Sequence, residues 1–202
     1  MHPKISYWID ESDIIRKVDD YWDLTLEDPT AQRVKSQAII GKPLFDFICD
    51  DITRMYVRTL LQSVRLLSRS LRRPYRCDSP NEKRYMEMII ALEDNGLISV
   101  THDLLRTEPI FIPVAFHTIE KPKKKLLDNY NIRCSLCNRL RLQNSDNWQE
   151  IDTIEPEIKA LNVVYGVCDD CMKQLKTKNH VTYLRRTSGC KATTHLNRVL
   201  KF

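Results

Sequence analysis

Four cysteines toward the C-terminal end of the chain occur as two pairs with the same spacing. Cys134 and Cys137 form the first C-x-x-C pair, and Cys168 and Cys171 form the second. A C-x-x-C turn places two sulfurs on one side of a tight loop, so each pair can bind one metal ion together. Two such loops supply four thiolates, a closed tetrahedral shell for Zn²⁺ with Zn–S distances of about 2.3 Å. The spacing therefore predicts a structural zinc site.

Other interpretations of these cysteines remain open. They could be two redox dithiols, or surface cysteines that fall in pairs by chance. Arg139, Arg141 and Lys173 are near in sequence and could favour a reactive thiolate. A shared zinc ion would block that reactivity, and neither His180 nor His195 has a context for pairing with a catalytic cysteine. We therefore expect one zinc ion per chain.

The 30 residues between the two pairs exceed the spacing of a compact zinc ribbon and leave room for a helix or hairpin. A core of this size is marginal alone, and a metal offsets the deficit. We expect residues 133–175 to form a zinc-binding module, and a chelator to unfold residues 130–172 while leaving the domain before residue 110 largely intact. The expected module core consists of Trp148, Ile151, Ile154, Ile158, Leu161, Val163, Val164 and Tyr165.

Size and composition describe an ordinary soluble protein with one sizeable core and a small second module. The chain has 202 residues, 42% of them hydrophobic and 29% charged. We find no signal peptide after Met1 and no run of about 18 apolar residues, so we expect no membrane span. Seven cysteines without an export signal predict a reducing, cytoplasmic setting, where C-x-x-C indicates metal binding or catalysis before disulfides.

The positive charge is concentrated in the C-terminal part of the chain. Residues 1–120 carry 16 Lys and Arg against 19 Asp and Glu, a net of −3, whereas residues 121–202 carry 16 against 8, a net of +8. No acidic residue follows Asp170. A tail of one sign can engage nucleic acid, an acidic partner or a membrane surface, or it can simply keep the chain soluble. We treat residues 176–202 as a basic tail.

The first half of the chain predicts two short strands followed by helices. Residues 6–10 and 14–18 read as strands around a turn, and residues 44–48 as a short helix. A long helix is expected over residues 52–71, because apolar and arginine side chains fall on separate arcs of a helical wheel. The arginine arc could bind phosphate, although a solvated face is the favoured interpretation. The apolar arc holds Val57, Leu60, Val64, Leu67 and Leu71, and the arginine arc Arg54, Arg58, Arg65, Arg69 and Arg72.

Three strands are expected after this helix. They begin near residue 73 and at residues 84–90 and 97–105, and the turn at residues 93–96 predicts a hairpin between the last two. This order predicts an α+β domain over residues 1–110, with one antiparallel sheet and helices on one face. Residues 111–132 are expected to be a linker. Within and beside it, residues 110–114 could add a strand, and residues 121–125 form an exposed basic stretch.

Several motifs of the first domain resemble, in order and spacing, a group of bacterial PAS-domain proteins. In that group a G-(K/R)-x-L-(W/F)-D-F-I segment precedes a T-R-x-x-Y helix and an R-C-D-(S/A)-P strand. The corresponding segments here are Gly-Lys-Pro-Leu-Phe-Asp-Phe-Ile at 41–48, Thr-Arg-Met-Tyr at 53–56, Arg-Cys-Asp-Ser-Pro at 76–80, Arg-Tyr-Met-Glu-Met at 84–88, and Leu-Leu-Arg-Thr-Glu-Pro at 104–109. In the second of them the tyrosine comes one position earlier than in the pattern.

The cysteine region resembles an element that often follows these domains. Its pattern is C-S-x-C-x-R, then a Trp, then H/Y-G-(I/V)-C-x-x-C, and residues 134–139, Trp148 and residues 165–171 match it. The resemblance therefore covers roughly residues 6–172, and the stretch from Lys173 onward falls outside it.

The resemblance implies a sensory or interaction module, with a five-stranded antiparallel sheet against short helices and often a cavity between them. No flavin or haem is expected. Leu44 stands where a photosensory PAS domain has its reactive cysteine, and residues 52–71 contain no histidine for haem. Cys77, Met86 and Met88 could line a cavity, but buried core residues are the better interpretation. A ligand therefore remains unassigned.

These observations predict a cytoplasmic PAS-domain signalling or regulatory protein with a structural zinc module. It would not be an enzyme, because we find no phosphoacceptor-histidine motif and no glycine-rich nucleotide loop. It would act through protein–protein contacts or small-ligand sensing, with a homodimer as one option and no membrane association. The alternative is a nucleic-acid-binding regulator that uses the zinc module and the acid-free residues 172–202.

Overall fold

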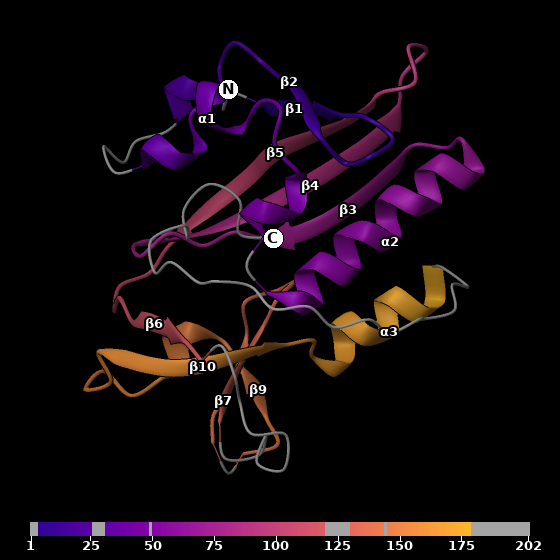
Figure 1. Ribbon diagram of the computed structural model, residues 1–202. Coiled ribbons are helices and arrows are strands. Elements are labelled where there is room, and N and C mark those ends of the chain that lie inside the picture. Colours follow the sequence, from indigo (N-terminus) through magenta and orange to yellow (C-terminus); the bar gives the residue numbers. More distant parts are fainter. Residues whose placement is uncertain (1–3, 26–30, 49, 120–129, 144, 179–202) are drawn as a thin grey trace. The chain divides into compact units, whose positions relative to one another are not determined.

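A computed structural model shows the arrangement of the chain (Figure 1). Its fold is α+β, with two five-stranded sheets and few helices among the described residues, which confirms the predicted class at that level. The expected basic stretch at residues 121–125 lies outside the described part of the chain. The described residues are 4–25, 31–48, 50–119, 130–143 and 145–178.

The chain divides into two compact units, which we describe separately. The first unit contains the described residues up to 77 together with residues 84–107. The second contains residues 78–83 and the described residues from 108 onward. The second unit therefore includes a turn between two strands of the first sheet, and it also includes part of the segment expected as a linker.

One five-stranded sheet forms the first unit, in the order β2-β1-β5-β4-β3. The pairs β1–β2, β1–β5 and β3–β4 are antiparallel. Strands β4 and β5 are neighbours joined by a tight turn, where Gly96 has a φ of +82° that favours glycine. The strands are β1 (Ile5–Ile9), β2 (Ile15–Val18), β3 (Leu71–Arg76), β4 (Glu82–Leu92) and β5 (Ile98–Pro109).

One face of this sheet carries the core because alternate strand residues point toward it. Tyr7 and Ile9 on β1 are fully buried, and so are Met88 and Ile90, which alternate with less buried residues on β4. The helical segments between β2 and β3 are η1 (Asp23–Thr25), η2 (Ala31–Val34), α1 (Ser36–Ile39), η3 (Leu44–Phe47) and α2 (Asp51–Leu67). These segments, with the exception of η1, contribute buried side chains to the same core cluster.

The long helix α2 begins where the sequence predicts but ends earlier. Asp50 caps it, because its carboxylate accepts a hydrogen bond from the Thr53 amide at 2.8 Å. The helix ends at Leu67, and Ser68 takes a left-handed conformation with a φ of 48°. Leu71, expected on the last turn, instead begins β3. The predicted apolar arc is therefore buried only at Val57, Leu60 and Val64.

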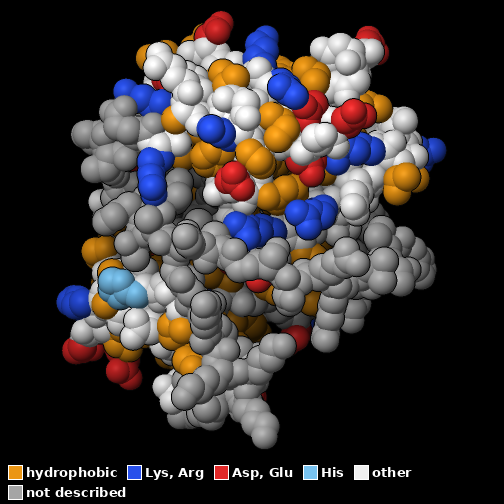
Figure 2. Space-filling model, viewed as in Figure 1, with side chains coloured by type: hydrophobic (Ala, Val, Ile, Leu, Met, Phe, Trp, Pro, Cys, Tyr) orange, Lys and Arg blue, Asp and Glu red, His pale blue; other side chains and the backbone are white. Residues whose placement is uncertain are grey.

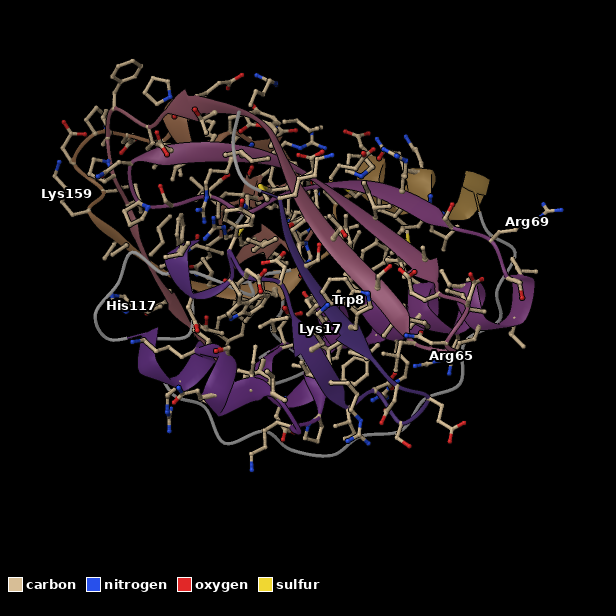
Figure 3. All side chains as sticks on the ribbon, turned by 90° about the horizontal axis from the view of Figure 1, so that it is seen from above. Trp8, Lys17, Arg65, Arg69, His117 and Lys159 are labelled. Carbon is tan, nitrogen blue, oxygen red and sulfur yellow. The ribbon has the colours of Figure 1, made fainter. Side chains whose placement is uncertain are left out.

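The predicted arginine arc divides for the same reason. Arg65 lies on α2 and Arg69 follows the helix (Figure 3). Arg65 forms an ion pair with Asp13 at 2.7 Å, whereas Arg72 on β3 pairs with Glu87 at 2.8 Å. On the face seen in Figure 2, basic, acidic and apolar side chains are interspersed. The five arginines therefore do not share one helical face.

A histidine lies within the core of the first unit. His102 on β5 is 3% exposed, and its ring stacks on Tyr7 with a centroid distance of 5.7 Å. Its Nδ1 shares a 2.8 Å hydrogen bond with the hydroxyl of Tyr75 on β3. Burial lowers the pKa of His102 from 6.5 to about 3, because the charged ring would lose its hydration there.

The second unit contains the other five-stranded sheet, in the order β6-β10-β7-β8-β9. Strand β10 pairs in parallel with both β6 and β7, whereas β7–β8 and β8–β9 are antiparallel. Its elements are β6 (Ala115–Thr118), β7 (Asn131–Cys134), β8 (Leu140–Arg141), β9 (Trp148–Gln149), η5 (Ile151–Thr153), β10 (Ala160–Gly166) and α3 (Asp169–Lys178).

The core of the second unit draws on both expected and unexpected residues. Ile151, Ile154 and Val163 are buried as predicted. Ile110 and Val114 join them, but residues 110–114 form no strand, and β6 follows at residue 115. The predicted strand at 110–114 is therefore wrong. The two apolar side chains are buried although their segment is irregular. A pattern of apolar residues alone does not distinguish such a segment from a strand.

The turn at residues 78–83 is held within the second unit by charged side chains. Asp78 and Arg133 are both almost fully buried, with a carboxylate oxygen 3.7 Å from the guanidinium. Lys83 is paired with Asp152 through a hydrogen-bonded ion pair. The amide of Ile110 also donates to the carbonyl of Asn81 at 2.7 Å. The turn thus supplies the acidic partner of one ion pair and the basic partner of the other. These two pairs and the backbone hydrogen bond position it.

Acid should destabilise the first unit through His102. The folded-state pKa of His102 is about 3, below its ordinary value of 6.5. Between these two pH values, the unfolded chain therefore binds a proton at this histidine that the folded chain does not bind. The contribution is fully present above about pH 6.5 and is lost as the pH falls toward 3. We expect His102→Gln to reduce the pH dependence of the unfolding free energy, measured by urea denaturation between about pH 4 and 7.

His117 on β6 provides the matched control because its side chain is exposed (Figure 3). His117→Gln should leave the pH dependence unchanged. An unaltered pH dependence in His102→Gln would show that this histidine does not carry the effect.

Candidate metal centre

Parallel pairing brings the two C-x-x-C loops to the same edge of the second sheet. Strands β7 and β10 run in parallel, and Cys134 at the end of β7 is level with Gly166 at the end of β10. Since both chains leave the sheet at this edge, the loop after each strand carries its cysteines to the same place. The amide of Ser135 donates to the carbonyl of Gly166 at 2.8 Å and joins the loops directly.

The first loop is a tight turn between β7 and β8. The amide of Cys134 donates to the carbonyl of Arg139 at 2.8 Å, and the amide of Asn138 donates to the carbonyl of Cys134 at 3.0 Å. Asn138 has a φ of 59°, a left-handed conformation that asparagine tolerates better than most residues. These bonds turn the sulfurs of Cys134 and Cys137 to the same side.

The second loop leads into a helix. Cys168 immediately precedes α3, Cys171 lies in its first turn, and the Met172 amide donates to the Cys168 carbonyl at 2.8 Å. The amide end of a helix carries a partial positive charge, which favours thiolates there. A Cβ at Gly166 would lie 2.9 Å from Cγ2 of Ile132, so the close approach of β10 to β7 favours glycine.

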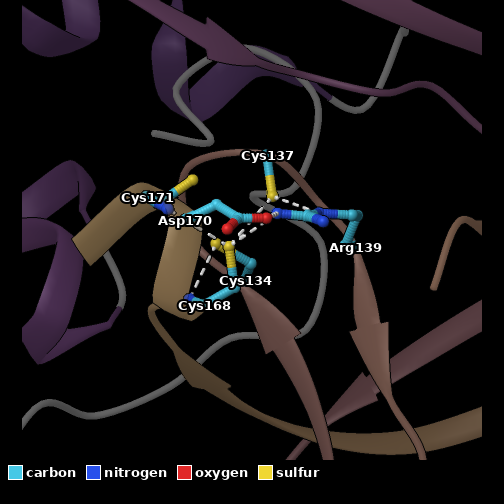
Figure 4. Close-up of polar contacts among 6 residues, drawn as sticks. All are labelled: Cys134, Cys137, Arg139, Cys168, Asp170 and Cys171. Atoms are coloured by element: carbon cyan, nitrogen blue, oxygen red, sulfur yellow. Dashed lines mark hydrogen bonds and ion pairs between the residues drawn. The ribbon is translucent and has the colours of Figure 1, made fainter. Parts of the chain in front are cut away.

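The four sulfurs lie close enough together to bind a single ion. All four Sγ atoms are within 4.8 Å of one another, and those of Cys137 and Cys168 are 3.6 Å apart (Figure 4). Zinc with Zn–S distances of about 2.3 Å would place its tetrahedral sulfurs about 3.8 Å apart. Cys134, Cys168 and Cys171 are buried and Cys137 is half-buried. The donor set and spacing are therefore compatible with zinc.

Nitrogen donors surround these sulfurs. The amide of Cys168 lies 3.4 Å from Sγ of Cys134, and the amide of Cys171 lies 3.5 Å from Sγ of Cys168. The Arg139 guanidinium donates to Sγ of Cys137 at 3.4 Å and to Sγ of Cys168 at 3.2 Å. It also forms an ion pair with Asp170 at 2.8 Å. The environment thus favours negatively charged sulfur.

Without a cation, the four thiols compete for protons. A hydrogen bond from Cys134 lowers the pKa of Cys137 far below its usual value, while the same contact raises the pKa of Cys134 to about 11. Hydrogen bonds with Cys134 and Cys137 raise the pKa of Cys171 strongly. One sulfur can ionise at the expense of its neighbours, but four thiolates together require a positive ion between them.

The structure brings together all four cysteines that the sequence singles out. It distinguishes among the nearby cations, because Arg139 contacts two of the sulfurs whereas the Arg141 guanidinium lies 6.0 Å from the centre of the Trp148 ring. The sequence reasoning missed the role of Asp170, whose only signal is its place between Cys168 and Cys171. His180, His195 and the tail from residue 179 lie outside the described residues.

No protein-family model matches the chain, and a search of the curated proteins finds no match either. Among the helices that the structure describes, none is long and apolar enough to cross a membrane. The cysteine cluster is therefore the feature of this chain that points most directly to a chemical role.

The metal content should depend on these four cysteines. We expect one zinc ion per chain in protein purified under reducing conditions, measured by elemental analysis. Cys134→Ser and Cys168→Ser should each lower the zinc content strongly, because each removes one of four ligands. Cys77→Ala is the matched control, since Cys77 is also buried but lies in the core of the first unit, and it should keep its zinc. Equal zinc in all variants would contradict the assignment.

Metal removal should loosen the turn at residues 78–83 as well as the cysteine loops. Arg133, which holds Asp78, immediately precedes Cys134 on β7, so disorder at the metal site reaches the ion pair directly. We expect a chelator to accelerate amide hydrogen exchange in β7, β10 and residues 78–83 while leaving β1 protected. Acceleration confined to residues 130–172 would show that the turn is held independently of the metal.

Proposed function

We propose that this chain is a PAS-like regulatory protein whose second unit is stabilised by one zinc ion. It acts through contacts with a protein partner or through a small ligand, and it catalyses no reaction of its own. The setting proposed for it is the reducing cytoplasm, because its cysteines serve as thiolate ligands.

The observation that carries the sensory part is the first unit's five-stranded sheet with its inserted helices. All of the described helical segments of this unit lie between β2 and β3, and buried side chains of η2, α1, η3 and α2 share one core with the inner face of the sheet. This is the arrangement that the resemblance to PAS domains implies. Of the motif segments, residues 44–47 form η3 and residues 53–56 lie on α2, whereas only residue 76 of the segment 76–80 belongs to a strand, at the end of β3.

The closed donor set supports a structural role for zinc. Four protein thiolates fill a tetrahedral shell and leave no open position for water or substrate, which a catalytic zinc ion requires. The burial of three of the four cysteines supports the same role. In this proposal zinc stabilises the fold of the second unit. Regulation depends on the protein partner or small ligand that binds the first unit.

Native mass spectrometry of the full chain tests this proposal most directly. Under gentle conditions it reports the metal, any retained ligand and the oligomeric state together. We expect one zinc ion per chain, no flavin and no haem. A metal-free chain with two disulfides would overturn the zinc assignment.

The regulatory role is tested by partner capture. We expect the tagged full chain to recover a protein partner from native cells, and that partner, tagged in turn, to recover the chain. The two purified proteins should then form a complex of fixed stoichiometry in size-exclusion chromatography with light scattering. Recovery of no partner, together with turnover of a metabolite by the purified chain, would replace this proposal with an enzymatic one.

A further inference from the structure

A zinc ion bound by four thiolates leaves a negative charge at the edge of the second sheet. Two positive charges against four negative ones give a formal net charge of about −2. Three of the four cysteines are buried, so water offers them little solvation. A closed shell of this kind therefore depends on hydrogen-bond donors and cations that surround the sulfurs.

Arg139 is the side chain that meets this need across both loops. Its Nε donates to Sγ of Cys137 at 3.4 Å, within the first loop, and an Nη2 hydrogen donates to Sγ of Cys168 at 3.2 Å, in the second loop. Its own carbonyl accepts the hydrogen bond from the Cys134 amide that closes the first loop. Figure 4 shows the guanidinium beside the sulfurs, where it faces the Asp170 carboxylate.

We propose that Arg139 is the positioning residue of the metal centre. Its guanidinium fixes the sulfurs of Cys137 and Cys168 in the geometry that zinc requires, and it compensates part of the negative charge of the filled site. This inference rests on the proposed zinc site and adds to it a residue that is not a ligand. Asp170 orients Arg139 through their 2.8 Å ion pair at the start of α3.

The geometry explains why an arginine stands here. The guanidinium is planar and presents several N–H donors in a fixed fork, so one side chain can donate to two sulfurs and a carboxylate at once. A lysine ammonium would keep the charge but would not reproduce this arrangement. Cys137 is half-buried whereas the other three cysteines are buried, so we expect its sulfur to depend most on this contact.

The test compares metal binding by the wild-type chain with that of Arg139→Gln, Arg139→Lys and Arg141→Gln. Zinc affinity is measured by competition with a chelator of known affinity. We expect Arg139→Gln to bind zinc roughly 10–100-fold more weakly, the usual cost of losing a partner of the ligands. Arg139→Lys should recover part of the loss because it keeps the charge. Arg141→Gln should bind like wild type, since Arg141 lies on β8 beside the Trp148 ring.

A spectroscopic readout separates positioning from general loss of structure. Cobalt(II) replaces zinc in thiolate sites, and its sulfur-to-metal charge-transfer absorption depends on the N–H donors to sulfur. At saturating cobalt, we expect this absorption to be shifted in Arg139→Gln and Arg139→Lys and unshifted in Arg141→Gln. Asp170→Asn, at an exposed carboxylate, should give a smaller change in the same direction and provides the test if Arg139→Gln does not fold.

The outcomes separate this inference from the proposed zinc site. If the wild-type chain binds no zinc or cobalt, the zinc site itself is refuted. If the wild type binds zinc and both Arg139→Lys and Asp170→Asn keep its affinity and its cobalt spectrum, the role of Arg139 is refuted while the zinc site stands.

Discussion

The second unit depends on the close approach of four sulfurs that cannot all be ionised without a cation. Backbone pairing holds β7 and β10 side by side, and their parallel direction brings both cysteine loops to one edge of the sheet. This pairing does not, however, resolve the competition for protons among thiols within 4.8 Å of one another. A divalent ion would resolve it, and the proposed zinc site therefore links metal binding to the folding of this unit.

The same dependence reaches residues that are far from the cysteines in sequence. Arg133 and Cys134 are consecutive on β7, so the strand that carries one of the clustered cysteines also carries the buried cation that pairs with Asp78. A buried ion pair contributes little net stability, but loss of either partner leaves an uncompensated charge. The pair therefore fixes where the turn at residues 78–83 lies, and Lys83 reinforces it through Asp152.

The elements that the sequence predicts well are those specified by local patterns. Neighbouring residues alone define the strands around residues 5–18, the strand at residues 84–90 and the turn at Gly96. The predicted end of α2 is wrong because the helical spacing of its leucines continues by coincidence into β3. Ser68 adopts a left-handed conformation there, and no pattern of apolar residues specifies that change.

The candidate site shows the same division between local and distant information. The four cysteines of the candidate site can be predicted because C-x-x-C spacing indicates a local turn. Two such turns predict one shared ion. The residues that contact or stabilise the site cannot be predicted from local spacing. Arg139 contacts Cys168 across 29 residues of sequence, and Asp78 contacts Arg133 across a longer stretch of the chain. Such contacts depend on which strands become neighbours. In this chain, the parallel pairing of β7 with β10 decides both the site and the residues that stabilise it.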